Sequence, residues 1–336
     1  MKRLLQAVPV VLLAACGEDA SLPRAEHAVS RAPLVVEQGG QFQGGQFQGG
    51  HMQGGQPQGD GTYGAAAPRE EPLAHLYAGM SLAGARLENV RIERGELVAE
   101  RDGRTSGRET LRGAQLAGAE LQAMTTSGAS LRHRIAGVTP EGSAGDTFLY
   151  RVEQQAGDGT WSAWCKPDVA GISAAIPVAA VFDGRGNRVE SRTHFTFGCT
   201  GGAIGKCTRW GYRPWATRDL HWACTRMARA DYCGDGTPNT REGTAINIWD
   251  TLSPAIQAHG PMKAGMHFEA GWSTHGAVCV GKQRWGTEPM VLGYRCPDRF
   301  IPPGFGFGTL VLCEDFFDGL PFGSVQLFNE SEVNVE

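Results

Sequence analysis

The sequence predicts an α+β fold that is mainly β, with a disulfide-stapled C-terminal domain that contains one main helix. Three observations predict it. Eight of the nine cysteines lie between residues 165 and 313 of the 336-residue chain. Short segments rich in β-branched and aromatic residues alternate with Gly, Pro and Asp turns, which is typical of strands. A single segment, residues 217–230, has apolar residues at helical spacing.

The chain opens with two basic residues and an apolar run from Leu4 to Ala15. The run is too short to cross a bilayer and has the size of a secretory signal core. It ends in LAAC, which resembles the lipobox of bacterial lipoproteins, where a diacylglycerol is attached to the cysteine and the chain is cut before it. We therefore expect residues 1–15 to be a signal peptide and Cys16 to carry a lipid. Gly17 favours the outer membrane. A cleaved signal without lipid and an uncleaved anchor are the alternatives.

Residues 16–72 have the composition of a disordered tether that begins at the lipidated cysteine. Gln and Gly dominate a five-residue repeat, GGQFQGGQFQGGHMQGG. Such a segment lacks the apolar surface needed to offset the entropy of ordering. As a flexible coil it would span roughly 40 Å, enough to hold a folded domain away from a membrane.

The five-residue spacing continues into residues 73–137, which we expect to form a β-rich, repeat-like segment. Leu82, Leu87 and Leu97 share one register, and a second run starts at Leu111. The spacing resembles the pentapeptide-repeat family, whose chains wind a square β-helix, but each run amounts to little more than one turn. The alternative, which we favour, is a pair of β-hairpins. Both interpretations make the segment β.

Residues 138–320 are expected to form one domain, and residues 321–336 a tail. Strands are expected in LRHRIAGV, TFLYRVEQQ, TWSAWC, IPVAAVFD, VESRTHFTFGC, TAINIWD, HFEAGWSTHGAVCV and TLVLC. Thr217 is the expected N-cap of the helix, and the segment Gly234-Asp235-Gly236 is expected to stop it.

The cysteines predict four disulfides. If Cys16 carries a lipid, eight cysteines remain, and an even number of cysteines outside the cytoplasm is typical of disulfide pairing. Which cysteine pairs with which is not derivable from the sequence. A metal cluster is the alternative, but zinc sites favour cysteines two to four residues apart and no CxxC occurs, so we expect no metal site. The cysteines expected to pair are Cys165, Cys199, Cys207, Cys224, Cys233, Cys279, Cys296 and Cys313.

Two local constraints bear on the pairing. Cys199 and Cys207 flank TGGAIGK, whose glycines would let a short loop close, so a bridge between them is plausible. Cys224 and Cys233 would be about 13 Å apart along one helix, and a bridge requires Cα atoms within about 7 Å. Either the helix ends before Cys233 or each of these cysteines pairs elsewhere.

A dense block of Cys, Trp and Gly resembles the ADYC domain, a family of exported bacterial proteins named for the tetrapeptide found here at residues 230–233. The matching strings are GYRPW, CTRMARADYCGDG and FEAGWS with GAVC, and the resemblance spans roughly residues 140–315. It implies a domain fused to a lipoprotein signal. It implies no activity, so no catalytic residue is carried over.

The same block contains side-chain oxygens that could form a calcium site. Asp231, Asp235 and Asn239 surround a Gly-rich turn, but their spacing does not match the calcium loop of an EF-hand. The interpretation that we favour makes Asp235 and Asn239 turn formers and pairs Asp231 with a nearby arginine such as Arg226.

An enzyme could also be built from these residues. His221 with Asp231 or Asp250 could form an acid–base pair, and Ser273 with His275 could act as nucleophile and base. No GxSxG or HExxH motif supports any of these pairs.

The sequence therefore predicts a lipid-anchored cell-envelope protein whose disulfide-rich domain has a binding or structural role rather than a catalytic one. Its expected partners are the membrane, through the N-terminal lipid, and an envelope protein or glycan. No cofactor is expected, and a net charge of −4 gives no reason to expect a nucleic acid. The alternative function is an envelope hydrolase that uses His221 and Asp231.

Overall fold

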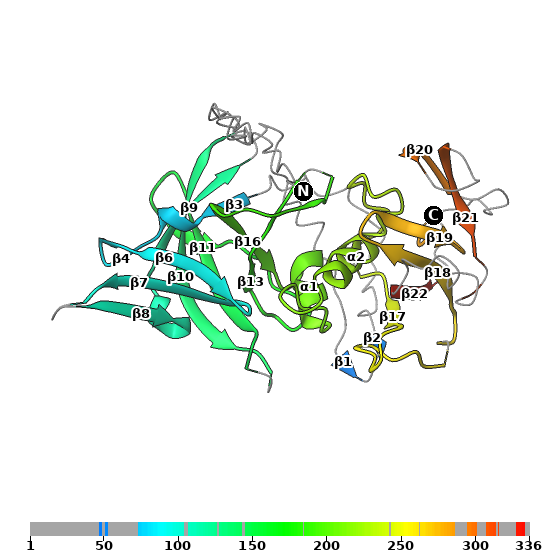
Figure 1. Ribbon diagram of the computed structural model, residues 1–336, viewed down its shortest axis with the longest axis horizontal. Coiled ribbons are helices and arrows are strands. Elements are labelled where there is room, and N and C mark those ends of the chain that lie inside the picture. The colour runs from blue at the N-terminus through cyan, green and yellow to red at the C-terminus, as the bar shows by residue number, and fades with distance from the viewer. Residues whose placement is uncertain are drawn as a thin grey trace, which may run out of the picture. The chain divides into compact units, whose positions relative to one another are not determined.

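Figure 1 shows the computed structural model of the chain. The structure describes residues 47–48, 51–52, 73–103, 107–125, 128–142, 145–183, 185–241, 243–261, 263–285, 294–300, 307–313, 315 and 327–332. The signal peptide expected over residues 1–15 and the lipid expected on Cys16 lie outside these residues. Most of the tether expected over residues 16–72 does too; its described residues form the antiparallel pair β1 (Phe47–Gln48) and β2 (His51–Met52).

A sheet built from residues 73–199 closes into a ring of six strands, because β9 pairs with both β3 and β10 (Figure 1). All neighbours in the ring are antiparallel. Its interior holds alternate side chains of each strand, and Tyr150, Phe195 and Phe197 are fully buried there. The ring strands are β3 (Leu73–Leu76), β9 (Glu120–Thr125), β10 (Ser130–Pro140), β11 (Phe148–Gln155), β13 (Ala175–Val178) and β16 (His194–Cys199).

Short strands extend this ring. They are β4 (Ser81–Leu82) and β5 (Ala85–Arg86) beyond β9, β12 (Trp161–Ala163) beside β11, and the separate pair β14 (Val181–Phe182) and β15 (Arg188–Val189). The sequence predicts a domain boundary between residues 137 and 138. Strand β10 runs through that point, because its partners on either side, β9 and β11, come from both sides of the expected boundary.

A three-stranded antiparallel sheet packs on the same core. Its strands are β6 (Glu88–Glu93), β7 (Glu96–Asp102) and β8 (Arg108–Arg112). Leu97, Ala99 and Leu111 are buried on its inner face, whereas ion pairs such as Arg91–Glu93 and Arg112–Glu93 cover its outer face. Two 3-10 turns, Tyr77–Gly79 and Gly113–Leu116, link these elements. The whole segment is therefore β, as the sequence predicts.

Helix α2 (Arg218–Arg229) confirms the predicted helix, and its inward side chains Leu220, Cys224 and Met227 are buried. Two details differ. Thr217 occupies the N-cap, but its hydroxyl donates to the Arg213 carbonyl at 3.3 Å instead of capping the helix. The last helical residue is Arg229, and the C-cap Ala230 takes the left-handed conformation (φ 50°). The helix therefore ends before the segment Gly234-Asp235-Gly236 that was expected to stop it.

Helix α1 (Ala203–Arg209) replaces the tight loop expected between Cys199 and Cys207. The glycines of TGGAIGK serve close packing: a Cβ on Gly205 would collide with the Cys199 carbonyl of β16. The glycine at position 205 therefore permits α1 to approach β16 closely, and does not serve the flexibility of a loop. Within the described ranges, neither helix has the length and apolar character needed to cross a membrane.

A second sheet has the strand order β17-β22-β18-β19-β21-β20, with α2 packed against β18 (Figure 1). All its neighbours are antiparallel except β19 and β21, which are parallel. The strands are β17 (Ile246–Asp250), β18 (Met266–Ser273), β19 (Gly276–Val280), β20 (Tyr294–Phe300), β21 (Phe307–Leu312) and β22 (Leu327–Glu332).

The position of β22 corrects the tail expected over residues 321–336. Its sequence, LFNESE, looks solvated, yet the strand lies between β17 and β18 with its first five residues buried. Each polar side chain has a partner: the Glu330 carboxylate accepts from Asn247 at 2.6 Å, and the Ser331 hydroxyl meets the Lys282 ammonium at 2.8 Å. Burial of polar groups is tolerated when they are hydrogen-bonded, so composition alone concealed this strand.

The eight cysteines form four disulfides, which confirms that the chain is disulfide-bonded. The pairs are Cys165–Cys199, Cys207–Cys224, Cys233–Cys296 and Cys279–Cys313, with Cα–Cα distances between 5.3 and 5.8 Å. The bridge between Cys199 and Cys207 that the sequence made plausible is wrong. Cys207 lies on α1 and is bonded to Cys224 of α2, whereas Cys199 is bonded to Cys165. Cys224 and Cys233 are not bridged to each other. The helix ends at Arg229, before Cys233, and the two cysteines pair with Cys207 and Cys296.

We expect deletion of residues 327–336 to abolish cooperative unfolding of the C-terminal half, because it removes a central strand and exposes both of its neighbours. Deletion of residues 333–336 alone is the control and should change the unfolding midpoint little. Urea unfolding followed by tryptophan fluorescence measures both. A shortened chain lacking β22 that unfolds like the full chain would contradict the central position of this strand.

Candidate functional site

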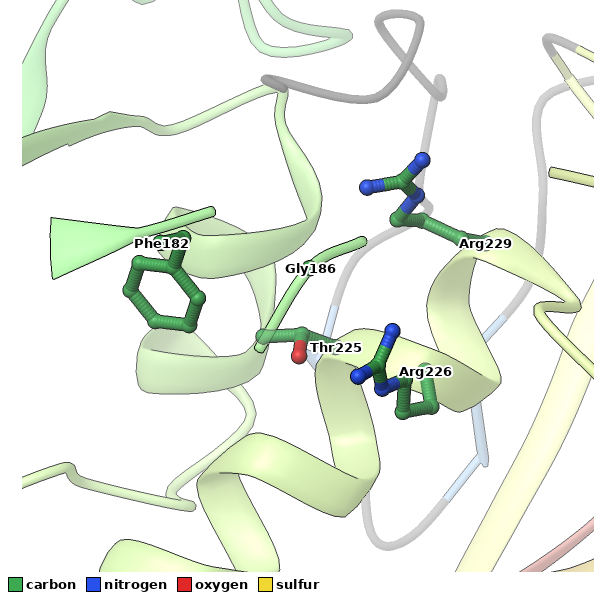
Figure 2. A pocket seen from close by; sticks show the side chains of 5 residues that line it. All are labelled: Phe182, Gly186, Thr225, Arg226 and Arg229. Atoms are coloured by element: carbon green, nitrogen blue, oxygen red, sulfur yellow. The ribbon is translucent and has the colours of Figure 1, made fainter. Parts of the chain in front are cut away.

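A small hollow faces the C-terminal half of α2. Its free space is about 270 Å³, including the part open to solvent, and Figure 2 shows the five side chains and backbone positions that line it. Thr225, Arg226 and Arg229 come from α2, and Phe182 and Gly186 come from the segment opposite the helix. The chemistry of the hollow is therefore set by two arginines.

The guanidinium of Arg226 donates its hydrogen bonds to other groups of the protein. It is 1 % exposed and donates from Nε to the Thr274 carbonyl at 3.2 Å and from Nη2 to Asn187 Oδ1 at 2.9 Å. Its Nη1 donates to the Arg185 carbonyl and to the carboxylate of Asp231. The side chain thus braces α2 against two loops, and the hollow is lined by a cation that is already neutralised.

Asp231 pairs with Arg226, which confirms the interpretation favoured from sequence. Its carboxylate also accepts from the backbone N–H groups of Asp235 and Gly236, each at 3.1 Å, and so closes the turn after α2. Burial raises the pKa of Asp231, and the guanidinium of Arg226 opposes that shift. The carboxylate is engaged on both oxygens by the chain.

The other two residues considered for calcium are turn formers. The Asp235 carboxylate accepts from the Thr237 N–H at 2.8 Å, and the Asn239 amide donates to the Ala230 carbonyl at 3.0 Å. Among the residues that the structure describes, no three side chains of His, Cys, Asp or Glu are grouped as metal ligands.

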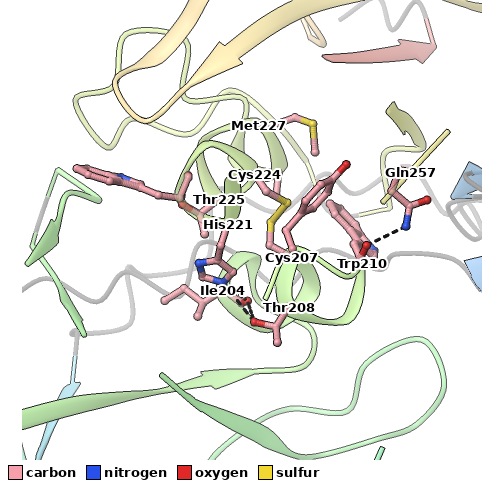
Figure 3. The surroundings of a disulfide bond; sticks show 12 residues. Ile204, Cys207, Thr208, Trp210, His221, Cys224, Thr225, Met227 and Gln257 are labelled. Atoms are coloured by element: carbon pink, nitrogen blue, oxygen red, sulfur yellow. Dashed lines mark hydrogen bonds between the residues drawn. A yellow bond between two sulfur atoms is a disulfide. The ribbon is translucent and has the colours of Figure 1, made fainter. Parts of the chain in front are cut away.

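His221 lies between the two helices, beside the Cys207–Cys224 bridge (Figure 3). It is fully buried, and its Nε2 lies 3.1 Å from the Ile204 carbonyl and 3.2 Å from the Thr208 hydroxyl. Because a carbonyl only accepts, Nε2 carries the proton, and Nδ1 is bare with no hydrogen-bond partner among the residues that the structure describes. Burial lowers the pKa of His221 to about 3, so the ring is neutral.

The structure does not bring His221 and Asp231 together. The partners of His221 come from α1, whereas those of Asp231 are Arg226 and the following turn. Both side chains are fully buried, so neither faces a substrate-sized space. The acid–base pair on which the hydrolase alternative depends is not formed.

The remaining catalytic candidates also hold loops. The Ser273 hydroxyl donates to the Gly276 carbonyl and accepts from the backbone N–H of His275, not from its ring. Asp250 accepts from the Tyr212 hydroxyl at 3.1 Å and from the backbone N–H of Gln257 at 2.7 Å. These contacts organise the turns after β18 and β17.

The strongest polar cluster was missed from sequence: a buried ion pair between Glu269 of β18 and Arg284. Arg284 donates from Nε to Glu269 Oε2 at 3.0 Å and from Nη2 to Oε1 at 2.9 Å, a bidentate arrangement. The two side chains are 0 % and 1 % exposed. Despite complete burial, the guanidinium holds the pKa of the Glu269 carboxyl below its usual value.

Neighbouring groups complete the pair. Tyr232 donates its hydroxyl to Glu269 at 3.1 Å and accepts from the Arg284 backbone N–H at 2.7 Å. Asn329 of β22 donates to Glu269 at 2.8 Å and accepts from the Trp272 indole at 2.7 Å. We call these five residues the Glu269 cluster.

The Glu269 cluster also reaches the C-terminus of α2. Arg284 donates to the carbonyls of Met227 at 2.8 Å and Ala228 at 3.2 Å, which belong to the last turn of α2, where a cation is favourable. A signal for the cluster did exist at one position: Glu269 is a charged residue inside the otherwise largely apolar strand pattern of β18. Nothing around Arg284, in GKQRWG, marked its partner.

Each residue of the tetrapeptide at positions 230–233 has a separate structural role. Ala230 takes the left-handed conformation that ends α2, and Asp231 closes the next turn against Arg226. Tyr232 joins the Glu269 cluster, and Cys233 bridges to Cys296 of β20. The tetrapeptide thus ties the helix end to the second sheet.

The closed sheet holds a second buried polar feature. His75 Nε2 lies 2.8 Å from His133 Nδ1, and both rings are fully buried among Trp164, Phe195 and Phe197. Burial lowers the pKa of His133 to about 4 and that of His75 well below its usual value. One ring donates its N–H to the bare nitrogen of the other, and both rings are closed to solvent, so the pair packs the sheet interior.

Comparison with known proteins gives one match. A family model described as the ADYC domain matches residues 113–286. The match includes Arg226, the tetrapeptide, Glu269 and Arg284, and it ends before Cys296, Cys313 and β22. No curated protein and no solved structure matches the chain.

We expect Tyr232→Phe to lower the free energy of unfolding by about 1–3 kcal/mol, because it removes a hydrogen bond to a charged group and leaves the Arg284 backbone N–H buried without its acceptor. The control is Tyr77→Phe, at a half-buried tyrosine outside the cluster, with an expected change below about 0.5 kcal/mol. Urea unfolding measures both. Equal changes in the two variants would contradict a special role of the Tyr232 hydroxyl.

Stability should fall on acidification because the folded-state pKa of His221, about 3, lies below its unfolded value. Between these two values the unfolded chain binds a proton that the folded chain does not, so the free energy of unfolding decreases by about 1.4 kcal/mol per pH unit for each such histidine. His221→Gln should reduce the loss between pH 7 and pH 5 by about 2 kcal/mol. His267→Gln, at an exposed histidine, is the control, and an unchanged pH profile in His221→Gln would disprove the assignment.

Proposed function

The chain belongs to the ADYC domain family, and from this premise we propose that it is a lipid-anchored protein of the bacterial cell envelope with a binding or structural role. The observation that carries the proposal is the pairing of all eight cysteines downstream of Cys16 into four disulfides. Disulfides of this number persist outside the cytoplasm and are rare in reducing compartments.

The N-terminal sequence supports the anchor. The apolar run of residues 4–15 and the LAAC string have the features of a lipoprotein signal, and Gly17 favours the outer membrane. The Gln/Gly-rich segment that follows would act as a tether, with the domain held at a distance of roughly 40 Å from the lipid.

The fate of the candidate catalytic groups supports a binding or structural role. His221, Asp231, Asp250 and Ser273 each make hydrogen bonds that hold helices or turns together. The described part of the chain is built around cross-links and satisfied polar clusters, which favours a rigid module. An envelope protein or a glycan is the proposed partner of such a module.

The lipid is tested by mass spectrometry of the mature N-terminal peptide from cells that express the full chain. We expect a peptide that begins at Cys16 and carries a diacylglycerol, and we expect Cys16→Ser to accumulate as an uncleaved precursor. Gly17→Asp is the sorting control and should move the protein from the outer-membrane to the inner-membrane fraction in an enteric host. An unmodified N-terminus after residue 16 would refute the anchor.

The compartment is tested by thiol alkylation of the same cells before and after reduction. Eight cysteines should react only after reduction. A chain that lacks residues 2–15 and stays in the cytosol is the control and should react without reduction. Free thiols in the full chain would argue against export.

A further inference from the structure

The four disulfides fall into two classes by their order along the chain. The first four cysteines pair with their sequence neighbours, and the last four interleave, because Cys279 lies inside the loop closed by one bridge and its partner lies outside it. The consecutive bridges are Cys165–Cys199 and Cys207–Cys224, and the interleaved bridges are Cys233–Cys296 and Cys279–Cys313.

Loop closure favours the wrong partners for the last four cysteines. The native bridges span 63 and 34 residues. Consecutive pairing would instead join Cys233 to Cys279, 279 − 233 = 46 positions apart, and Cys296 to Cys313, 313 − 296 = 17 positions apart. Because the probability of closure falls as about the 3/2 power of loop length, the consecutive arrangement is favoured about fourfold in an unfolded chain.

Local structure places Cys233 close to the strand that carries Cys279, its partner in the wrong arrangement. The Tyr232 carbonyl accepts from the Ala277 N–H at 3.0 Å, so the residue before Cys233 lies against the strand that carries Cys279. Strand β20 pairs with β21 in a register that places Cys296 opposite Gly308, so this antiparallel pair does not itself select the native partner of either Cys296 or Cys313. The native bridge from Cys279 to Cys313 follows the parallel pairing of β19 with β21, which needs a crossover connection and so forms late.

The direction of export adds to this bias. A chain that enters an oxidising compartment from its N-terminus presents Cys233 and Cys279 before Cys296. Once the sheet has formed, Cys279, Cys296 and Cys313 are at most 1 % exposed, so errors must be corrected before they are buried. The consecutive bridges need no such correction.

We propose that maturation of this protein requires a thiol–disulfide isomerase as a partner, and that the requirement arises from the interleaved bridges alone. The inference rests on the export stated in the proposed function. In each exchange a thiolate of the isomerase attacks a non-native bridge, forms a mixed disulfide and releases one protein thiolate. That thiolate attacks the other non-native bridge, and a last protein thiolate displaces the isomerase, so two bridges are exchanged for two with no net oxidation.

The test is oxidative refolding of the full reduced chain carrying Cys16→Ser, which leaves eight thiols. Refolding proceeds with an oxidant alone or with a purified bacterial disulfide isomerase added, and bridges are trapped by acid and mapped as peptides under non-reducing conditions. With oxidant alone we expect the Cys233–Cys279 and Cys296–Cys313 peptides to dominate the early map. The isomerase should raise the yield of the native map about fivefold.

Two double variants separate interleaving from disulfide number. Cys279→Ala with Cys313→Ala leaves only consecutive pairs, so its three remaining bridges should form equally well without isomerase. Cys165→Ala with Cys199→Ala also removes one bridge but keeps the interleaving, and it should still depend on the isomerase. The early peptide map is informative even if a variant does not reach a stable fold.

Native bridges that form at full yield with oxidant alone would overturn the proposal, as would equal isomerase dependence of the two double variants. These results do not depend on the N-terminus, because refolding is carried out in solution. A missing lipid on Cys16 would contradict the proposed anchor and leave the folding result intact. A folding result without isomerase dependence would contradict the inference and leave the anchor intact.

Discussion

The buried ion pair between Glu269 and Arg284 is the constraint that arranges the C-terminal half of the chain. Two opposite charges taken out of water are tolerated only when their remaining donors and acceptors are satisfied. Here that requirement draws in Tyr232 after α2, Asn329 of β22 and two carbonyls at the end of α2. The pair therefore favours the meeting of this helix end with these strands, since removing any of these partners would leave a buried donor or acceptor of the ion pair with one hydrogen bond fewer.

Much of this arrangement could be predicted from local patterns, and the rest depended on distant ones. The apolar spacing of residues 217–230 was enough to identify α2, and an even number of cysteines downstream of an expected signal peptide was enough to predict disulfides. The pairing of Arg226 with Asp231 was also within reach, because the two lie five positions apart around a helix end. Each of these inferences depends on groups close in sequence or on composition.

The misses share one cause, which is that the deciding partner is far away in the chain. β22 looks like a solvated tail until Asn247, Trp272 and Lys282 supply partners for its polar side chains. Gly205 looks like a loop residue until the Cys199 carbonyl of β16 lies against it. The bridge from Cys233 to Cys296 crosses 63 residues and could not be chosen from spacing.

The ion pair and the disulfide from Cys233 to Cys296 have different effects on folding, and they meet at the adjacent residues Tyr232 and Cys233. A buried ion pair favours one arrangement over others but adds little net stability compared with an apolar core of the same volume. A disulfide acts mainly on the unfolded chain and contributes roughly 2–4 kcal/mol. Because Tyr232 and Cys233 are adjacent, the bridge to Cys296 holds the residue that satisfies Glu269, so stability from the cross-link is coupled to the specificity of the polar cluster. The tetrapeptide is the point where the two requirements meet, which gives a physical reason for that run of residues without invoking catalysis.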